Sequence, residues 1–528
     1  MSSNTESWGS RLGLVLAMAG NAVGFGNFLR FPVQAIQNGG GAFIVPYMVC
    51  FLLLGMPLLF VEWSMGRFGG QFGDHSTPFI FDRMGKKAVW KYIGVSGIFI
   101  NIGVAAYYCY LESWTLGYLW YSVTGAFSGQ TSDGVNAMFT HYVGLSGNIP
   151  WICWVLCLAI NTWILSRGLE GGVEVAAKIG MPLLILFGIF LAIRALTITA
   201  GSDGAINDGL VGANFLWKPD FSTIWTAKVW LAAAGQIFFT LSVGWGMIHS
   251  YAAYIKPNDD IALNSLSAGW TNEFVEVVLG ASIVIPISVG YLGIERVVEL
   301  TQSGGLGLGF RTMPYLFQQW GPVLAMLAGV AWFGLLFFAG ITSSLAMGTP
   351  WMSFLRDEFN WSRNKSALSF AAIVFVLGLP TVLFYNEGVF DEFDYWVGTV
   401  GLVLAGLLEI ILFSWIFGIE KGWKEINRGA DIRLPIFFKY VLKYVTPLII
   451  AFVFIGSLPD IYDNLVHKKL YAKIAAATNP ADIAAFQTQM TYLNWSRLLL
   501  ISVFFGICYM VFLASKKRKE KALNAMGR

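Results

Sequence analysis

Charge is scarce in this 528-residue chain. Asp, Glu, Lys and Arg make up 12% of it, about half of their share in an average soluble domain, while hydrophobic residues make up 56%. The formal net charge of +3 is too small to suggest a nucleic-acid partner. The 21 Trp and 42 Phe supply material for interfacial belts and lipid-facing surfaces. The composition therefore indicates an integral membrane protein.

Groups that carry chemistry are also few. The five cysteines, at positions 50, 109, 153, 157 and 508, all lie in apolar segments and form no cluster with histidine or carboxylate, so we interpret them as packing residues. The four histidines, at positions 75, 141, 249 and 467, are scattered and unpaired with cysteine. A membrane-embedded enzyme would need a nucleophile–base pair or metal ligands. The sequence therefore argues against an enzyme.

Apolar runs of bilayer length recur about twelve times along the chain. They predict an all-α integral membrane fold with twelve transmembrane helices, near residues 11–37, 41–66, 90–123, 150–166, 174–197, 228–255, 261–291, 322–355, 366–384, 393–417, 436–457 and 495–515. The first, third, sixth and eighth of these runs are the least uniform.

The loops between these runs differ in their content of Lys and Arg. The loops at 124–149 and 385–392 contain neither, whereas the loop after the second run contains five, at positions 67, 83, 86, 87 and 91. By the positive-inside rule, the basic loops and both termini are cytoplasmic, including the N-terminus at 1–10 and the basic tail at 516–528. The loop at 124–149 holds neither cysteine nor an Asn-x-Ser/Thr acceptor, which favours a prokaryotic plasma-membrane protein.

The first run is interrupted over residues 18–32 by three glycines, two asparagines and Arg30. Irregular backbone survives in a membrane only inside protein or beside a polar cavity, because unpaired N–H and C=O groups are costly in hydrocarbon. Freed carbonyls can hold a cation, and freed N–H groups can hold a carboxylate. The interruption therefore predicts a binding site built from a broken helix at mid-membrane depth.

A second interruption, QIFFTLSVGWG at 236–246, cuts the sixth run. Paired breaks in the first and sixth runs predict an inverted five-plus-five repeat with the substrate at the repeat interface. The first repeat would cover 11–200 and the second 201–420, followed by the last two helices at 430–515.

Five motifs resemble those of the neurotransmitter:sodium symporters, the family of the bacterial leucine transporter. They are NAVGFGNFLRFP at 21–32, GGGAF at 39–43, FFTLS at 238–242, FAGITSS at 338–344 and DEFDYW at 391–396. The resemblance runs from about Trp8 through the twelfth run. It implies a fold like that of the leucine transporter, with helices 1 and 6 broken, and sodium-coupled transport of a neutral amino acid by alternating access.

The resemblance also implies two sodium sites. The ligands of the first would be Ala22, Asn27, Thr240 and Asn272, and those of the second Gly20, Val23, Ala339, Thr342 and Ser343. Neutral oxygens of this kind suit a hard monovalent cation without trapping it. From the residues alone, Thr342 and Ser343 can equally be hydroxyls bonded back to their own helix.

The resemblance places the substrate in the first break. The implied contacts are Asn21, Ala22, Gly24, Phe25, Gly26, Val104, Tyr108, Phe239, Thr240, Ser242, Trp245, Ser343 and Met347. Gly24 leaves room for the substrate's own carboxylate, which would accept N–H bonds from Phe25 and Gly26. Trp245 replaces the phenylalanine of the leucine transporter and fills more space, which favours glycine, alanine or another small neutral amino acid. Selectivity for larger hydrophobic amino acids such as leucine is the alternative.

Glu276 lies one turn beyond Asn272 on the same helix face, where chloride-dependent relatives have serine. With Tyr47, Gln236, Thr240 and Asn272 nearby, this carboxylate would take the place of chloride, so we expect chloride-independent transport, with proton counter-movement through Glu276 left open. Glu62, Glu112 and Glu409 also lie in apolar runs, and structural hydrogen bonds are an equal interpretation for them.

The resemblance implies two gates. Arg30 and Asp394 would close the outer side, with Tyr108 and Phe239 as a thin lid over the substrate. Trp8 and Asp357 match the inner gate, but Thr5 stands where the family has an arginine, so Asp357 would need another cation. A channel or an amino-acid sensor is the alternative from another class, although the polar residues cluster at one depth and do not line a pore. A homodimer through the ninth and twelfth runs is left open.

Overall fold

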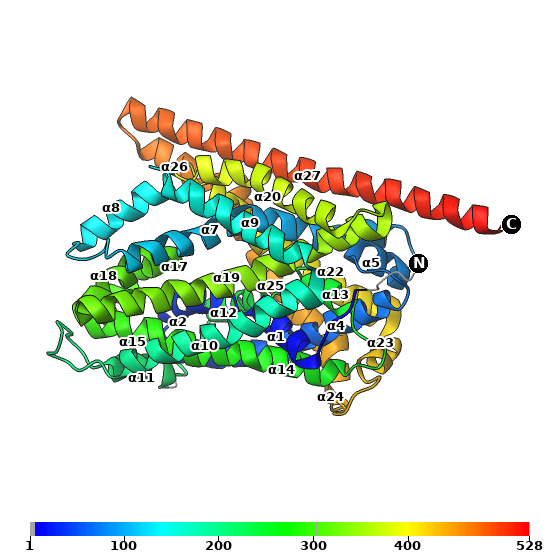
Figure 1. Cartoon of the computed structure of the whole chain (residues 1–528), viewed down its shortest axis with the longest axis horizontal. Helices are drawn as coiled ribbons and strands as arrows, with labels where there is room; N and C mark the ends of the chain where they lie inside the picture. Colours follow the sequence, from blue (N-terminus) through cyan, green and yellow to red (C-terminus); the bar gives the residue numbers. More distant parts are fainter. Residues whose placement is uncertain (1–5, 219, 223, 303, 527–528) are drawn as a thin grey trace. The chain divides into compact units, whose positions relative to one another are not determined.

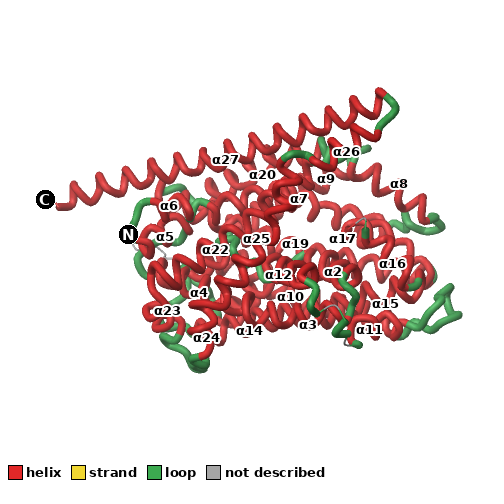
Figure 2. The backbone as a smooth tube through the Cα atoms, turned by 180° about the vertical axis from the view of Figure 1, so that it is seen from behind, coloured by secondary structure: helices red, strands yellow, loops and turns green. Residues whose placement is uncertain are grey.

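The computed structural model describes residues 6–218, 220–222, 224–302 and 304–526, and the predicted gate position Thr5 lies outside them. These residues form helices and turns and contain no strand (Figure 2). Ten helices are long and apolar enough to cross a membrane, and a bent helix pair adds an eleventh such segment among the described residues. The predicted all-α membrane fold is confirmed.

The helices, which Figure 1 labels in chain order, belong to two compact units, each made of three stretches of sequence. Unit 1 comprises Met1–Met56, Tyr108–Ser242 and Leu263–Leu345, and unit 2 comprises Pro57–Tyr107, Val243–Ala262 and Ala346–Arg528. The helices α7 (Ser96–Val123), α14 (Ile261–Glu273) and α19 (Pro322–Phe359) each continue from one unit into the other.

Unit 1 contains the first break and most of the predicted site. Its other elements are α1 (Arg11–Ala22), η1 (Gly26–Arg30), α2 (Phe31–Gln37), α3 (Gly41–Cys50), η2 (Phe51–Gly55), α8 (Ser132–Val143), α9 (Ile149–Ser166), η3 (Leu169–Val173), α10 (Glu174–Leu196), α11 (Gly209–Trp217), α12 (Ala227–Thr240), η4 (Phe274–Gly280), α15 (Ala281–Leu292), α16 (Ile294–Thr301), α17 (Gly304–Gly307), η5 (Leu308–Thr312), α18 (Met313–Phe317) and η6 (Gln318–Trp320).

Unit 2 contains the C-terminal helices. Its other elements are α4 (Met56–Gly70), α5 (Thr77–Gly85), α6 (Val89–Ile93), α13 (Met247–Ala252), α20 (Arg363–Leu383), α21 (Val389–Phe393), η7 (Asp394–Gly401), α22 (Leu402–Ile411), η8 (Leu412–Gly418), α23 (Ile419–Ile426), α24 (Phe437–Tyr440), η9 (Val441–Val445), α25 (Thr446–Leu465), α26 (Lys468–Ala476) and α27 (Pro480–Met526). In both views α27 runs alongside α20.

Both predicted interruptions are present as breaks in helices. The Ser10 hydroxyl caps α1 by accepting the Gly13 N–H, and α1 then ends at Ala22. The chain resumes as η1 and α2 at an angle of 45° to α1. In the sixth run, α12 ends at Thr240 and α13 begins at Met247. Ser242 has a φ of 54° and Gly244 a φ of +81°, so left-handed residues turn the chain between the two helices.

Several helix boundaries differ from the expectation. The last helix covers Pro480–Met526 and is much longer than the predicted span at 495–515. Short helices such as α8, α11, α16, α23 and α26 occupy stretches that we expected to be connections. A search for apolar runs of bilayer length does not detect such short helices, because many of them are polar on one face.

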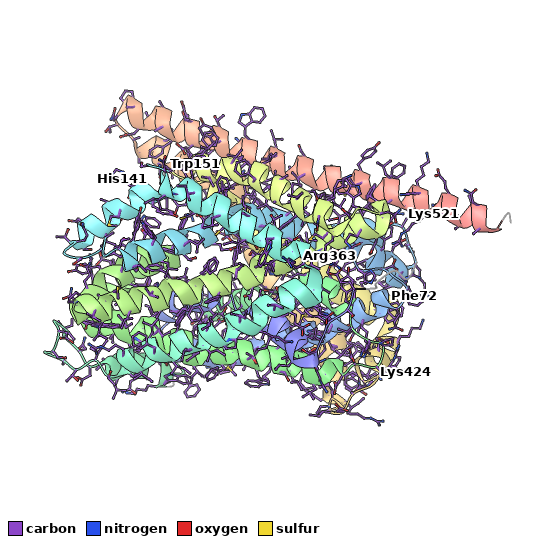
Figure 3. All side chains as sticks on the ribbon, in the orientation of Figure 1. Phe72, His141, Trp151, Arg363, Lys424 and Lys521 are labelled. Carbon is purple, nitrogen blue, oxygen red and sulfur yellow. The ribbon has the colours of Figure 1, made fainter. Side chains whose placement is uncertain are left out.

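Several cationic side chains of unit 2 lie at one end of its helices, whereas Lys468, Lys469 and Lys473 belong to α26 at the other end. Arg363, Lys424 and Lys521 all lie at the former end together with Phe72 (Figure 3). Ion pairs hold part of this end together, including Arg67 with Glu425 at 2.9 Å and Arg518 with Asp74 at 2.8 Å. This clustering agrees with the alternation of basic and non-basic loops in the sequence.

Candidate functional site

The break after α1 redirects backbone groups that a continuous helix would pair internally. The Gly24 N–H donates to Asn27 Oδ1 at 2.8 Å and not to the carbonyl four residues earlier. The Asn21 carbonyl accepts the hydroxyls of Ser242 at 3.0 Å and Ser343 at 3.3 Å. The Phe25 N–H meets the Tyr108 hydroxyl at 3.5 Å. The break therefore brings Tyr108 of α7, Ser242 just after α12 and Ser343 of α19 to the same few backbone atoms.

A buried polar network lies beside this break. Asn27 donates to Asn272 Oδ1 at 2.9 Å and to Glu276 Oε2 at 3.1 Å, and Asn272 donates to Thr240 Oγ1 at 3.0 Å. The Thr240 hydroxyl also donates to Glu276, and Gln236 donates to Glu276 Oε1 at 2.8 Å. All five side chains are at most 1% exposed. Of the expected neighbours of Glu276, Gln236 and Thr240 thus bond to it directly, and three of the four predicted ligands of the first sodium site lie in the same network.

A second buried carboxylate, which the sequence analysis missed, adjoins the network. Glu273 is 3% exposed and interacts electrostatically with Glu276, and the buried Tyr47 hydroxyl lies beside both carboxylates. Two glutamates three residues apart in an apolar run could have signalled this pair, since they share a helix face. Two buried carboxyl groups therefore lie side by side at one point of unit 1.

The predicted second sodium site lies where α1 packs against α19. A Cβ at Gly20 would lie 3.0 Å from Thr342 Cβ, so only glycine allows this close approach. The Thr342 hydroxyl bonds to Phe338 O at 2.9 Å, and the Ser343 hydroxyl bonds to Ala339 O at 3.1 Å. Both hydroxyls therefore bond back to their own helix, as the alternative interpretation anticipated, and the sodium role of these residues stays a prediction.

Gly24 is enclosed by two hydroxyls. A Cβ on this residue would lie 2.9 Å from Tyr108 Oη and 3.1 Å from Ser343 Oγ. Near it, the Asn21 side chain is 1% exposed, and neither atom of its amide makes a hydrogen bond to another described group. Buried amides are usually satisfied, so an unpaired one in a polar pocket indicates a position where a ligand supplies the partner.

We expect Gly24→Ala to weaken substrate binding at least about tenfold, or ~1.4 kcal/mol, because the new methyl group displaces the Tyr108 hydroxyl from the break. Equilibrium binding of radiolabelled substrate to purified protein measures this. Gly235→Ala on α12 is the matched control, since a Cβ there meets nothing within 4 Å. If Gly24→Ala and Gly235→Ala bind the substrate with equal affinity, Gly24 is not part of the substrate site.

The remaining predicted substrate and gate residues are distributed between the units. Val104, Trp245 and Met347 belong to unit 2, where each is at most 2% exposed. The Trp245 carbonyl is fixed by Asn101 Nδ2 at 2.6 Å. In unit 1, the Arg30 guanidinium stacks on the ring of Phe239, 4.5 Å from its centroid.

Both gate aspartates have partners within unit 2. The Tyr107 hydroxyl donates to Asp394 Oδ1 at 2.6 Å. Asp357 accepts the backbone N–H of His75 at 3.1 Å, and the imidazole Nδ1 of the same residue lies 3.2 Å away. His75 is therefore a hydrogen-bonding partner of Asp357 that the sequence analysis did not name. Trp8 lies in unit 1 and is half-buried.

Comparison with known proteins identifies the family. The profile of the sodium:neurotransmitter symporter family matches residues 5–137 and 133–517. The chain belongs to this family. It is therefore a sodium-dependent membrane transporter and not an enzyme.

Named relatives agree with this assignment. An uncharacterized sodium-dependent transporter of Methanocaldococcus jannaschii is 32% identical over 467 residues, covering 86% of this chain and 90% of the relative. The sodium-dependent nutrient amino acid transporter 1 of Drosophila melanogaster is 24% identical over 537 residues, covering 89% and 80%. The crystal structure of MhsT in complex with L-phenylalanine superposes with a TM-score of 0.74 at 28% identity, covering 86% of this chain and 99% of MhsT. The symporter has the same fold, in which helices 1 and 6 are broken.

Proposed function

We propose that this symporter couples inward sodium movement to the uptake of a neutral amino acid by alternating access. The observation that carries the proposal is the buried network of Asn27, Thr240, Asn272 and Glu276 at the break in α1. The side-chain oxygens of Asn27, Thr240 and Asn272 are neutral, and the Glu276 carboxylate adjoins them. Such a set of oxygens suits a monovalent cation inside a membrane protein. Sodium bound there would stand beside the amino-acid carboxylate, so each ligand raises the affinity for the other by the same factor.

The substrate carboxylate would accept the N–H groups of Phe25 and Gly26, with the Tyr108 hydroxyl as a further donor. In the structure the Phe25 N–H donates to the Tyr108 hydroxyl at 3.5 Å, so two of these three proposed donors are neighbours, which supports the proposal. The amine would face the backbone near Ala22, Phe239 and Thr240 and the Ser242 hydroxyl. A second sodium ion would use Gly20, Val23, Ala339, Thr342 and Ser343.

Glycine, alanine or another small neutral amino acid is the substrate that we favour, because the indole of Trp245 fills space. The buried position of Trp245, with its carbonyl fixed by Asn101, supports this role. A larger hydrophobic amino acid is the second candidate, since the structurally similar MhsT binds L-phenylalanine.

We expect Trp245→Phe to shift selectivity toward larger amino acids. Removing part of the indole enlarges the space by about one or two methylene groups, which changes relative affinity by roughly 10- to 200-fold. Competition of alanine, leucine and phenylalanine against one radiolabelled substrate measures the shift. Trp63→Phe, which shortens another fully buried tryptophan in unit 2, is the control. If Trp245→Phe binds alanine, leucine and phenylalanine in the original order of affinity, residues other than Trp245 limit the size of the substrate.

The protein would lie in a plasma membrane with the basic end of unit 2 facing the cytoplasm. Both termini would then be cytoplasmic. Arg30 with Asp394 would close the outer gate, and Trp8 and Asp357 would belong to the inner one. The outward faces of α20 and α27 carry large exposed apolar side chains, among them Leu368, Val376 and Phe505. Lipid would cover these faces, or a second copy would pair through them, and cross-linking in membranes distinguishes the two.

Ligand binding to the purified protein tests the proposal. Radiolabelled alanine, glycine, leucine and phenylalanine are compared in sodium, then with potassium substituted, then with chloride removed. Binding of the small amino acids that needs sodium and ignores chloride is the expected result. If leucine or phenylalanine binds most tightly, sodium-coupled transport remains supported, but the substrate is a large amino acid and not a small one. If amino acids bind equally well with and without sodium, the proposed coupling of transport to sodium is wrong.

A further inference from the structure

Three ionisable side chains that take no part in the proposed transport site meet inside unit 2. Glu62 of α4 and His249 of α13 are 0% exposed, and Glu409 of α22 is 2% exposed. His249 Nδ1 lies 3.4 Å from Glu62 Oε2, and His249 Nε2 lies 3.5 Å from Glu409 Oε1. The imidazole thus stands between two carboxylates, with one ring nitrogen facing each. We call these three residues the imidazole cluster.

The facing atoms of the imidazole cluster lack other partners. Both ring nitrogens, Glu62 Oε2 and Glu409 Oε1 are buried, and none makes a hydrogen bond of good geometry to another described group. On the side of the imidazole, the Phe81 ring packs with its centroid 5.8 Å away. Buried polar atoms are normally satisfied. The arrangement therefore points to a small charged ligand, a proton or a cation, shared by the three residues.

Charge balance limits what that ligand can be. Two carboxylates with a neutral imidazole would leave two negative charges buried, at a high cost in desolvation. The other charged side chains on α4 and α5, the helix of Phe81, do not supply the balance. Arg67 pairs with Glu425 at 2.9 Å, Arg83 pairs with Asp74 at 2.5 Å, and Asp82 is itself acidic and half-buried. The helices α13 and α22 carry no further charged residue.

Geometry distinguishes a proton from a metal ion. The ligand atoms lie within 4.8 Å of one another, so a dication could be considered. A metal ion, however, needs one ring nitrogen and both carboxylates to converge on a single point. Here the two nitrogens face different carboxylates, which is the arrangement of an imidazolium that donates one N–H to each. Two protons on three groups, giving an imidazolium, one carboxylate and one carboxylic acid, make the cluster neutral.

The imidazole cluster is also attached to the second helix break. Glu62 Oε1 accepts the N–H of Gly244 at 2.5 Å, and a Cβ at Gly244 would lie 2.8 Å from the Leu402 carbonyl at the start of α22. Gly244 adjoins Trp245 and has a φ of +81°. An ionised Glu62 is a stronger acceptor for this N–H than a neutral one. The charge on the imidazole therefore determines how firmly the break is held.

We propose that Glu62, His249 and Glu409 form a buried proton-binding site that clamps the second helix break of the symporter. The protonated imidazole keeps Glu62 ionised and bonded to Gly244, and loss of that proton loosens the clamp. The site is independent of which amino acid is carried, because none of its three residues belongs to the proposed sodium or substrate contacts.

Nitrogen NMR of histidine tests this site directly. Full-length protein labelled with ¹⁵N-histidine is reconstituted in liposomes, and the signal of His249 is assigned by its absence from the spectrum of the His249→Gln variant. At a pH of about 8, well above the usual histidine pKa of ~6.5, we expect both nitrogens of His249 to carry protons. His141, which is exposed on α8 (Figure 3), is the internal reference for a histidine in contact with solvent.

The carboxylates are tested in the same experiment. Glu62→Gln preserves side-chain shape but removes the charge that holds the imidazolium, so His249 should become neutral at this pH. Glu409→Gln resembles the uncharged carboxylic acid of the proposed state and should leave His249 protonated. A neutral His249 in the otherwise unchanged protein at a pH of about 8 would overturn the proposal. So would a His249 signal that moves on addition of Zn²⁺ and returns with a chelator, since this would show a metal site.

Discussion

We expect Asn27→Ala to abolish sodium-dependent substrate binding. The Asn27 side chain accepts the Gly24 N–H at 2.8 Å, and it donates to Asn272 at 2.9 Å and to Glu276 at 3.1 Å. Removing it leaves at least two buried groups without a partner, at about 1–3 kcal/mol each, and also removes a proposed sodium ligand. A sodium titration of radiolabelled amino-acid binding should therefore show at least about a 100-fold loss of apparent sodium affinity, or ~2.7 kcal/mol.

Asn38→Ala provides the control for losing a buried asparagine in unit 1. Asn38 is 8% exposed and bonds only locally, from its amide to the Gln34 carbonyl at 2.8 Å, so its loss should leave the sodium titration unchanged. An Asn27→Ala protein that folds and binds substrate with the original sodium dependence would show that the cation binds elsewhere.

Glu276→Ser should make transport depend on chloride. The Glu276 side chain accepts from Gln236 and Asn27 and lies beside Tyr47, so these donors surround the negative charge that we expect Glu276 to supply. Serine removes that charge and leaves room for a small anion among the same donors. Uptake by the unaltered protein should be equal in chloride and in gluconate. Uptake by the variant should be low in gluconate and recover in chloride.

Glu276→Gln distinguishes loss of charge from loss of volume. Glutamine occupies nearly the same space, so it leaves no room for an anion, and we expect low uptake in both media. If uptake by the unaltered protein falls when chloride is removed, Glu276 does not take the place of the anion. Similar recovery of the serine and glutamine variants by chloride would indicate that the anion acts at another position.

The membrane fold and the two helix breaks could be predicted because their signals are local. Glycine and asparagine in an apolar run mark the break after Ala22, and Gln236, Thr240 and Asn272 could be placed near Glu276 through the family resemblance. The structure confirms that these side chains meet. It also shows the Thr342 and Ser343 hydroxyls bonded within α19, which the residue types alone had left open.

Features that depend on distant contacts could not be predicted. His249 is one of four scattered histidines in the sequence, yet it lies between Glu62 and Glu409, 187 and 160 positions away along the chain by residue number. The partner of Asp357 was missed for the same reason, since His75 stands 282 positions earlier. Helix ends were also missed: α27 begins at Pro480, well before its apolar run, because a polar helical extension carries no hydropathy signal.

Sodium-driven accumulation in proteoliposomes tests the central claim most directly. Each sodium ion that enters gains ~2.3 kcal/mol per 100 mV of inside-negative potential, in addition to its concentration gradient. With sodium outside and potassium inside, we predict that radiolabelled alanine or glycine rises above its external concentration, and that equal sodium on both sides abolishes this accumulation at zero potential. Amino-acid uptake that stops at equal concentrations despite the sodium gradient would contradict symport at the broken helix.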